Sequence, residues 1–215
     1  MLKCRGVRFS PPFADRDEAG RRLATELPEL DRPIVLALPR GGAPVAAAVA
    51  RAIDAPLDVF VVCKLGVPSQ PELAMGAVAS GGVRVVNDDV VRRAGVTEAV
   101  LEEVTARERA VVESRERLYR SGRAPVALTA RAVVLVDDGL ATGATMRAAV
   151  AAVRALGPRR VVVAVPVAPL ETVAEFARDG LEIACVYVVR DFVSVGSWYG
   201  DFGQVTDEEV IRLIS

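Results

Sequence analysis

Two adjacent carboxylates, Asp137 and Asp138, follow the apolar run Val133–Val136 and precede a stretch rich in Gly, Ala and Thr. Neighbouring carboxylates repel each other and are costly to bury, so this placement favours a ligand that brings hydroxyls or positive charge. Residues 143–157 are predicted to be a helix, and the first turn of a helix offers unpaired N–H groups and a positive dipole end to an anion. Acceptors beside an anion site match a sugar phosphate.

Residues Ala141 to Thr145 supply the donors of this predicted anion site. Gly143 and Ala144 would let a phosphate approach the backbone, and the hydroxyls of Thr142 and Thr145 add further donors. Neither a Walker loop nor a GxGxxG fingerprint is present. The alternative is an ordinary strand–turn–helix junction, in which Asp-Gly makes the turn and Thr142 caps the helix.

Two further strand ends carry residues suited to phosphate chemistry. After the first apolar strand comes "LPRGG", where Arg40 brings fixed positive charge. We expect Gly41 and Gly42 to adopt the positive φ that exposes N–H groups to an anion. Lys64, one of two lysines in the chain, follows the second strand. It is either a phosphate contact or an exposed base with a packed stem.

The C-terminal tail is aromatic and glycine-rich, and it contains the one tryptophan of the chain. Its rings could stack on a planar acceptor or close the end of a small core. The candidates are Phe192, Trp198, Tyr199 and Phe202.

Apolar β-branched runs alternate with helical patterns along the chain. We predict strands over residues 33–38, 57–62, 83–87, 132–136, 159–167 and 182–189. We predict helices over residues 16–27, 43–53, 97–119, 143–157 and 170–178, and a last helix with a capping box of Thr206 and Glu209. Strands that are apolar on both faces indicate an α/β fold with a central, mainly parallel sheet of about five strands flanked by helices. Ligands of such sheets bind beyond the carboxyl ends of the strands.

The domain organisation follows from the same pattern. We expect a single domain over residues 1–215 with its core at 33–190. Residues 65–82, rich in Gly, Pro, Ser and Ala, are predicted to be a long loop. Residues 190–215 are predicted to form a small C-terminal hood, alone or with the N-terminal segment.

Composition excludes several classes of function. The chain has 215 residues, a net charge of −1 and no histidine, which argues against nucleic-acid binding and removes Ser-His and Cys-His chemistry. Its three cysteines are far apart, which is typical of a reducing compartment and not of a disulfide framework. No apolar run reaches the roughly 18 residues that a membrane span needs, and no signal peptide is evident. A cytoplasmic protein is expected.

The string Asp137–Thr145, preceded by four apolar residues, resembles the phosphoribosyl-pyrophosphate (PRPP) motif of the type I phosphoribosyltransferases. The resemblance implies that Asp137 and Asp138 bind the ribose hydroxyls and that Ala141, Thr142, Gly143, Ala144 and Thr145 cradle the 5′-phosphate. It further implies a pyrophosphate loop at Arg40, Gly41 and Gly42, a phosphate contact at Lys64, and a mobile loop over 65–82 that carries Glu72. Gly139 departs from the family, which usually has an apolar residue there.

The resemblance covers about residues 33–190, and the order of segments is similar to bacterial proteins described only as predicted phosphoribosyltransferases. It implies a pentosyltransferase of nucleotide metabolism that moves 5-phosphoribosyl from PRPP to a nitrogen nucleophile, a nucleobase above all, and releases pyrophosphate. Mg²⁺ would be held through PRPP and water, with no direct protein ligand. A non-catalytic PRPP- or nucleotide-sensing regulator on the same fold is the alternative. The hood residues Phe192, Trp198 and Tyr199 would face the acceptor, whose identity stays open. Whether the protein forms a homodimer also stays open.

Overall fold

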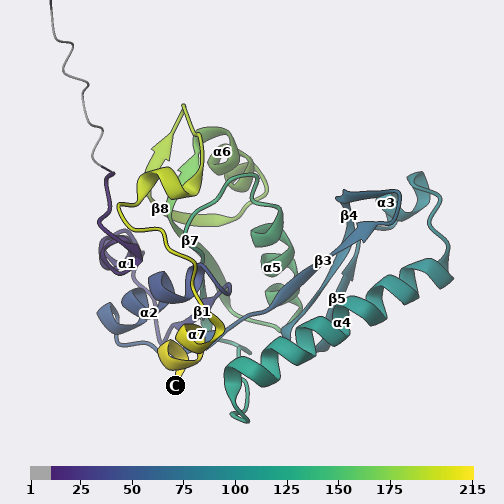
Figure 1. Cartoon of the computed structure of the whole chain (residues 1–215), viewed down its shortest axis with the longest axis horizontal. Helices are drawn as coiled ribbons and strands as arrows, with labels where there is room; N and C mark the ends of the chain where they lie inside the picture. The colour runs from purple at the N-terminus through teal and green to yellow at the C-terminus, as the bar shows by residue number, and fades with distance from the viewer. Residues whose placement is uncertain (1–10) are drawn as a thin grey trace, which may run out of the picture.

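The computed structural model describes residues 11–215, and its centre is a parallel sheet of five strands in the order β2-β1-β6-β7-β8 (Figure 1). The strands are β1 (Ile34–Ala37), β2 (Leu57–Val59), β6 (Ala132–Val136), β7 (Arg160–Pro169) and β8 (Glu182–Val189). The predicted fold class is therefore confirmed. The sequence locates β6 and β8 at their observed bounds because both are continuous apolar or β-branched runs.

Helices cover both faces of this sheet. The helices are α1 (Arg16–Ala24), α2 (Gly42–Ala52), α3 (Asp88–Arg93), α4 (Glu98–Arg120), α5 (Ala144–Ala155), α6 (Leu170–Arg178) and α7 (Asp207–Ile214). Alternate residues of each strand point to opposite faces, so Val134 packs in the core beneath α2, whereas Leu135 packs in the core beneath α5. Both faces are buried, which explains why the interiors of β1, β6 and β7 are apolar.

A second, antiparallel sheet forms an arm beside the central one. It consists of β3 (Val62–Val67), β4 (Gln70–Ala79) and β5 (Val83–Val86), with the short turn η1 (Ser80–Gly82) between the last two. The long helix α4 lies along this sheet (Figure 1). The strand expected over 57–62 therefore ends at Val59, and the chain leaves the central sheet to begin the arm.

The long loop expected over residues 65–82 is wrong, since most of this segment is the β3–β4 hairpin. Its glycines mark close approaches of the backbone. A Cβ at Gly66 would lie 2.6 Å from the Pro71 carbonyl oxygen, and one at Gly76 would lie 2.4 Å from the Val85 carbonyl oxygen. Leu65 and Met75 are fully buried in the core that α4 covers, which gives the hairpin its packing.

The tail after β8 packs against the start of the described chain. Phe13 and Tyr199 form a parallel bridge, and η2 (Val195–Trp198) precedes it. The Phe13 N–H donates to the Trp198 carbonyl at 3.1 Å, and the Gly200 N–H donates to the Phe13 carbonyl at 2.8 Å. The hood is thus built from both ends of the chain and lies over the carboxyl ends of β7 and β8 (Figure 1).

Candidate functional site

The two carboxylates lie where the central sheet ends. Asp137 directly follows β6, and its partner strand β1 ends at the same level because Ala37 pairs with Val136. The loop after β1 is therefore brought against Asp137 and Asp138. The Asp138 N–H donates to Asp137 Oδ1 at 2.9 Å, which holds the first carboxylate against the backbone of the second.

Gly41 and Gly42 are required by this close approach. A Cβ at Gly41 would lie 2.3 Å from Asp138 Oδ2, and a Cβ at Gly42 would lie 2.7 Å from the Val136 carbonyl oxygen. The expectation of positive φ is wrong: Gly41 has φ −56° and Gly42 begins α2. The loop also contains a cis peptide bond between Pro39 and Arg40, and Arg40 is exposed. The glycines let the loop backbone lie on the carboxylates.

Burial and mutual repulsion act on both carboxyl groups. Burial, followed by the negative charge of Asp138, raises the pKa of Asp137 to about 8. Burial also raises the pKa of Asp138, although the Arg16 guanidinium opposes this rise. Such a pair is unfavourable in the empty protein and becomes favourable when hydroxyl donors or a cation meet it. Perturbed carboxyl groups of this kind are typical of functional sites.

The predicted anion site lies at the N-terminus of α5. Gly143 is its N-cap residue, with φ 71°, and as a glycine it has no side chain with which to cap the helix. A Cβ at Gly143 would lie 2.6 Å from the Phe176 ring, so both conformation and space require glycine here. The first amide groups of α5 therefore stay open to a ligand.

The rest of this loop is held in place from α6 and is open to solvent. The Thr172 hydroxyl donates to the Ala141 carbonyl at 2.8 Å, and Thr142 Oγ1 accepts from the Ala144 N–H at 3.5 Å. Ala141, Thr142, Ala144 and Thr145 are exposed. The structure thus places five predicted residues in one loop between the carboxylates and a helix N-terminus.

Gly139, where the sequence departs from the resemblance, allows the hood to pack. A Cβ at Gly139 would lie 2.7 Å from Val195 Cγ1 and 3.2 Å from Val167 Cγ1. The hood residue Val195 therefore fills the space in which an apolar side chain at 139 would lie.

The hood reaches the carboxylates through Tyr199. Its hydroxyl donates to the Asp138 carbonyl at 2.5 Å, and burial raises its pKa. The ring centroid of Tyr199 lies 5.4 Å from that of Phe13 and 5.0 Å from that of Phe202, and the residue is 4% exposed. Tyr199 thus packs inside the hood. Of the two roles predicted for the tail aromatics, Tyr199 has the second, which is to close a small core. Trp198 packs on Tyr187 and is half-buried, as is Phe192.

Arg16 is the residue of this site that sequence reasoning missed. Its Nε and Nη2 both lie 3.0 Å from Asp138 Oδ2, and its Nη1 donates to the Gly203 carbonyl at 2.9 Å. No local motif joins residues that are 122 positions apart. One signal was available: a cation at the first position of α1 opposes the helix dipole, so another interaction must compensate for it.

Lys64 lies within β3 and not at a strand end. Its ammonium group is 3.3 Å from Glu72 Oε2 and donates to the Glu72 carbonyl at 3.2 Å. Lys64 and Glu72 therefore meet each other on the hairpin. Cys63 and Leu65 point to the opposite, buried side of β3, so Lys64 occupies the more exposed face.

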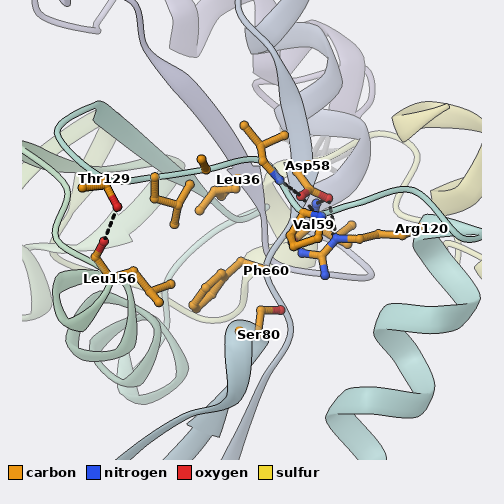
Figure 2. Close-up of a pocket in the computed structure, with 13 residues that line it drawn as sticks. Leu36, Asp58, Val59, Phe60, Ser80, Arg120, Thr129 and Leu156 are labelled. Atoms are coloured by element: carbon orange, nitrogen blue, oxygen red, sulfur yellow. Dashed lines mark hydrogen bonds and ion pairs between the residues drawn. The ribbon is translucent and has the colours of Figure 1, made fainter.

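A separate pocket of about 350 Å³ lies beneath the segment 125–129 (Figure 2). Leu36, Phe60 and Leu156 make its apolar wall, and the Asp58–Arg120 pair lies at one end. Its lining includes no residue of the 38–42 or 137–145 loops. Asp58 accepts from Arg120 Nε at 3.0 Å and from the Val126 N–H at 3.1 Å, so this pair anchors α4 and the covering segment to β2.

Among residues 11–215, no helix combines the length and apolar character needed to cross a bilayer. In the same part of the chain, no three or more acidic, cysteine or histidine side chains gather into an arrangement that could hold a metal ion.

Several known proteins are similar to this chain in sequence or in fold. Two Mycobacterium tuberculosis proteins, each named "Putative phosphoribosyl transferase", are each 47% identical to this chain over 204 residues. The match covers 94% of this chain and 46% of those proteins, so the chain spans about half the length of these curated relatives. The crystal structure of the protein TT1426 from Thermus thermophilus has 47% identity and a TM-score of 0.87, covering 94% of this chain and 97% of that one.

A more distant structure, a hypothetical protein from Neisseria gonorrhoeae solved with bound ppGpp, shares the fold at 14% identity and a TM-score of 0.50. It covers 93% of this chain and 90% of that one. The phosphoribosyl transferase domain family matches residues 17–193, which include both carboxylates, both loops and the start of the hood. The chain belongs to the phosphoribosyl transferase domain family.

Proposed function

We propose that the protein binds PRPP at the carboxyl end of the central sheet and transfers its 5-phosphoribosyl group to a nitrogen nucleophile, releasing pyrophosphate. One observation carries the proposal: the Asp137–Asp138 pair lies between the Gly41–Gly42 backbone and the open N-terminus of α5. PRPP has a phosphate at C5, two ring hydroxyls and a diphosphate at C1, and three neighbouring elements of the site suit these three groups.

Each element has a role that its chemistry suits. The amide groups at the start of α5, with Thr142 and Thr145, would bind the 5′-phosphate. Asp137 and Asp138 would accept hydrogen bonds from the 2′- and 3′-hydroxyls. The loop with Arg40 would face the diphosphate, which is the leaving group.

The chemistry asks for charge stabilisation and the exclusion of water. As the bond between C1 and the diphosphate oxygen breaks, positive charge develops on the ribose ring and negative charge on the leaving group. The two carboxylates would lie beside the ring and stabilise its positive charge, and Arg40 would stabilise the negative charge on the leaving group. The nucleophile's nitrogen then forms the new bond to C1. Because the protein binds both reactants in fixed positions, the entropic cost of bringing them together no longer adds to the activation free energy of the chemical step.

Mg²⁺ is proposed as a companion of PRPP and not as a resident ion. The described residues offer no cluster of three or more metal-binding side chains. The proposal rests on the preference of Mg²⁺, which keeps several waters and binds through substrate phosphates, so no residue of this chain is proposed as a direct ligand. When bound, Mg²⁺ would offset the charge of the diphosphate.

Lys64 stays a proposed phosphate contact. Its partner Glu72 is fully exposed, and exposed ion pairs are weak. A substrate phosphate could therefore draw the ammonium group away from Glu72.

The test is the release of pyrophosphate from labelled PRPP and Mg²⁺ across a panel of purine and pyrimidine bases. We expect turnover with at least one base, and loss of that turnover in Asp137→Asn and Asp138→Asn. Asp54→Asn is the matched control, because Asp54 is exposed, lies after α2 and has φ 50°, a conformation that Asn also adopts. Tight binding of PRPP with no turnover for any base would instead favour a PRPP-sensing regulator, and no binding at all would overturn the proposal.

A further inference from the structure

Arg16 joins three parts of the molecule at one guanidinium group. Nε and Nη2 contact Asp138 Oδ2 at 3.0 Å, Nη1 donates to the Gly203 carbonyl at 2.9 Å, and the group lies 3.9 Å from the centroid of the Phe202 ring. The side chains of Arg16 and Asp138 are only 11% and 15% exposed, so water screens this pair weakly. Arg16 therefore contacts the carboxylate and the hood at once from the N-terminal helix, in addition to the bond from the Tyr199 hydroxyl to the Asp138 carbonyl.

The geometry leaves half of the Asp138 carboxylate available. Both contacts from Arg16 end on Oδ2, which is also the atom that a Cβ at Gly41 would touch. A guanidinium that gripped both oxygens side by side would occupy the whole carboxylate. Here Oδ2 lies between Arg16 and the Gly41 backbone, whereas no side chain of residues 11–215 donates a hydrogen bond to Oδ1, which could therefore accept one from a substrate hydroxyl.

The charged surroundings of Asp138 explain why such a residue is needed. Asp137 precedes it and repels it, the Tyr199 hydroxyl is bound to its main-chain carbonyl and not to its carboxylate, and Arg40 adjoins the Gly41 backbone. Among residues 11–215, Arg16 is the cation that forms an ion pair with this carboxylate.

We infer that Arg16 is a positioning residue: it favours the ionised form of Asp138, orients this carboxylate for a sugar hydroxyl, and fixes the hood to the donor site through Phe202 and Gly203. The substrate in this inference rests on the proposed function, whereas the effect on Asp138 does not. Arg16 then couples the binding of the sugar phosphate to the packing of the hood.

Arg22 provides a matched control on the same helix. Its guanidinium lies 5.0 Å from the centroids of Phe13 and Tyr187 and donates to the Tyr187 hydroxyl and the Pro12 carbonyl. It therefore resembles Arg16 in its contacts with hood aromatics but has no contact with Asp138. Arg22→Gln should reproduce any general loosening of the hood.

The experiment has a ligand-free part and a binding part. Carboxyl-carbon NMR titration of ligand-free wild type, Arg16→Gln, Arg16→Lys and Arg22→Gln should show the Asp138 midpoint rising by about one pH unit or more in Arg16→Gln. The midpoint should rise less in Arg16→Lys, which keeps the charge, and should not move in Arg22→Gln. An unchanged midpoint in Arg16→Gln overturns the inference whether or not the protein binds PRPP.

The binding part uses calorimetry with Mg²⁺ and PRPP between pH 6.5 and 9. We expect Arg16→Gln to bind about tenfold more weakly than wild type at pH 7, and this gap to narrow as the pH rises, because Asp138 then ionises without Arg16. Ionisation of Asp137, whose pKa is raised to about 8, falls in the same range but affects both proteins, so the ratio of the two affinities is the readout. Arg22→Gln should follow wild type. If Arg16→Gln binds more tightly than wild type, Arg16 blocks the site and the inference fails. If wild type itself does not bind, the proposed function fails, and the NMR result still decides the role of Arg16.

Discussion

The backbone of Gly41 lies so close to Asp138 that a Cβ at Gly41 would stand 2.3 Å from Asp138 Oδ2. The loop after β1 and the carboxylates after β6 therefore form one packed unit. Arg16 reaches the same oxygen from the other end of the chain.

Gly41→Ala should disrupt this unit. The added methyl group must displace the carboxylate or the loop, and overpacking of this kind costs roughly 1–3 kcal/mol. We expect at least a tenfold loss of PRPP affinity by calorimetry, together with a lower melting temperature. Gly95→Ala is the control: it strains a residue with φ 64° but meets no atom within 4 Å. It should lower stability and leave affinity intact, and equal losses of affinity in both variants would contradict the account.

Asp137→Asn should change how the stability of the ligand-free protein depends on pH. The folded-state pKa of Asp137 is raised to about 8 by burial and by Asp138, so the folded protein binds more protons than the unfolded chain between about pH 4 and 8. The contribution of Asp137 is present below the unfolded pKa and is lost as pH rises through the folded pKa.

Thermal unfolding between pH 5 and 9 checks this expectation. Wild type should lose more stability than Asp137→Asn as pH rises, and Asp137→Asn should be the more stable of the two near pH 9. Asp54→Asn, an exposed change, should follow wild type. Parallel pH profiles for wild type and Asp137→Asn would show that Asp137 is not under strain.

Arg120→Met should destabilise the fold by roughly 3–5 kcal/mol, because it leaves Asp58 buried and unpaired. Urea unfolding measures the loss. Arg117→Met, which removes an exposed i,i+4 pair with Glu113, should cost no more than about 0.5 kcal/mol. Similar losses of stability in the two variants would mean that the Asp58–Arg120 pair, beside the pocket in Figure 2, does not anchor α4 to β2.

Lys64→Met should weaken PRPP binding severalfold while lowering the free energy of unfolding by no more than about 1 kcal/mol, since its partner Glu72 is exposed. Calorimetry and urea unfolding separate the two effects. Glu72→Gln removes the same ion pair but keeps the cation, so it should bind PRPP at least as well as wild type. If both variants bind alike, Lys64 is not a phosphate contact.

The sequence predicts those parts of the site that lie within a few residues of each other. Asp137 and Asp138 are recognisable because two adjacent carboxylates follow a buried strand, and the open α5 N-terminus follows from its Gly and Thr residues. The central sheet is equally predictable, since both faces of each strand are apolar.

The rest depends on contacts between distant segments. Arg16 meets Asp138 across 122 residues, and Tyr199 meets it across 61, so no local pattern could reveal either. From the sequence alone, the glycines of residues 65–82 predict a loop, and Gly41 and Gly42 predict positive φ. In the structure they allow another backbone or side chain to come close, and this requirement is visible only once the partner is known.

The most direct test of the donor site is a calorimetric titration of PRPP with Mg²⁺ into wild type and into the Asp137→Asn/Asp138→Asn double variant. We expect saturable binding of one PRPP per chain to wild type and at least a hundredfold weaker binding to a double variant that is folded by circular dichroism. Equal affinity for the two proteins, or no binding to wild type, would contradict it.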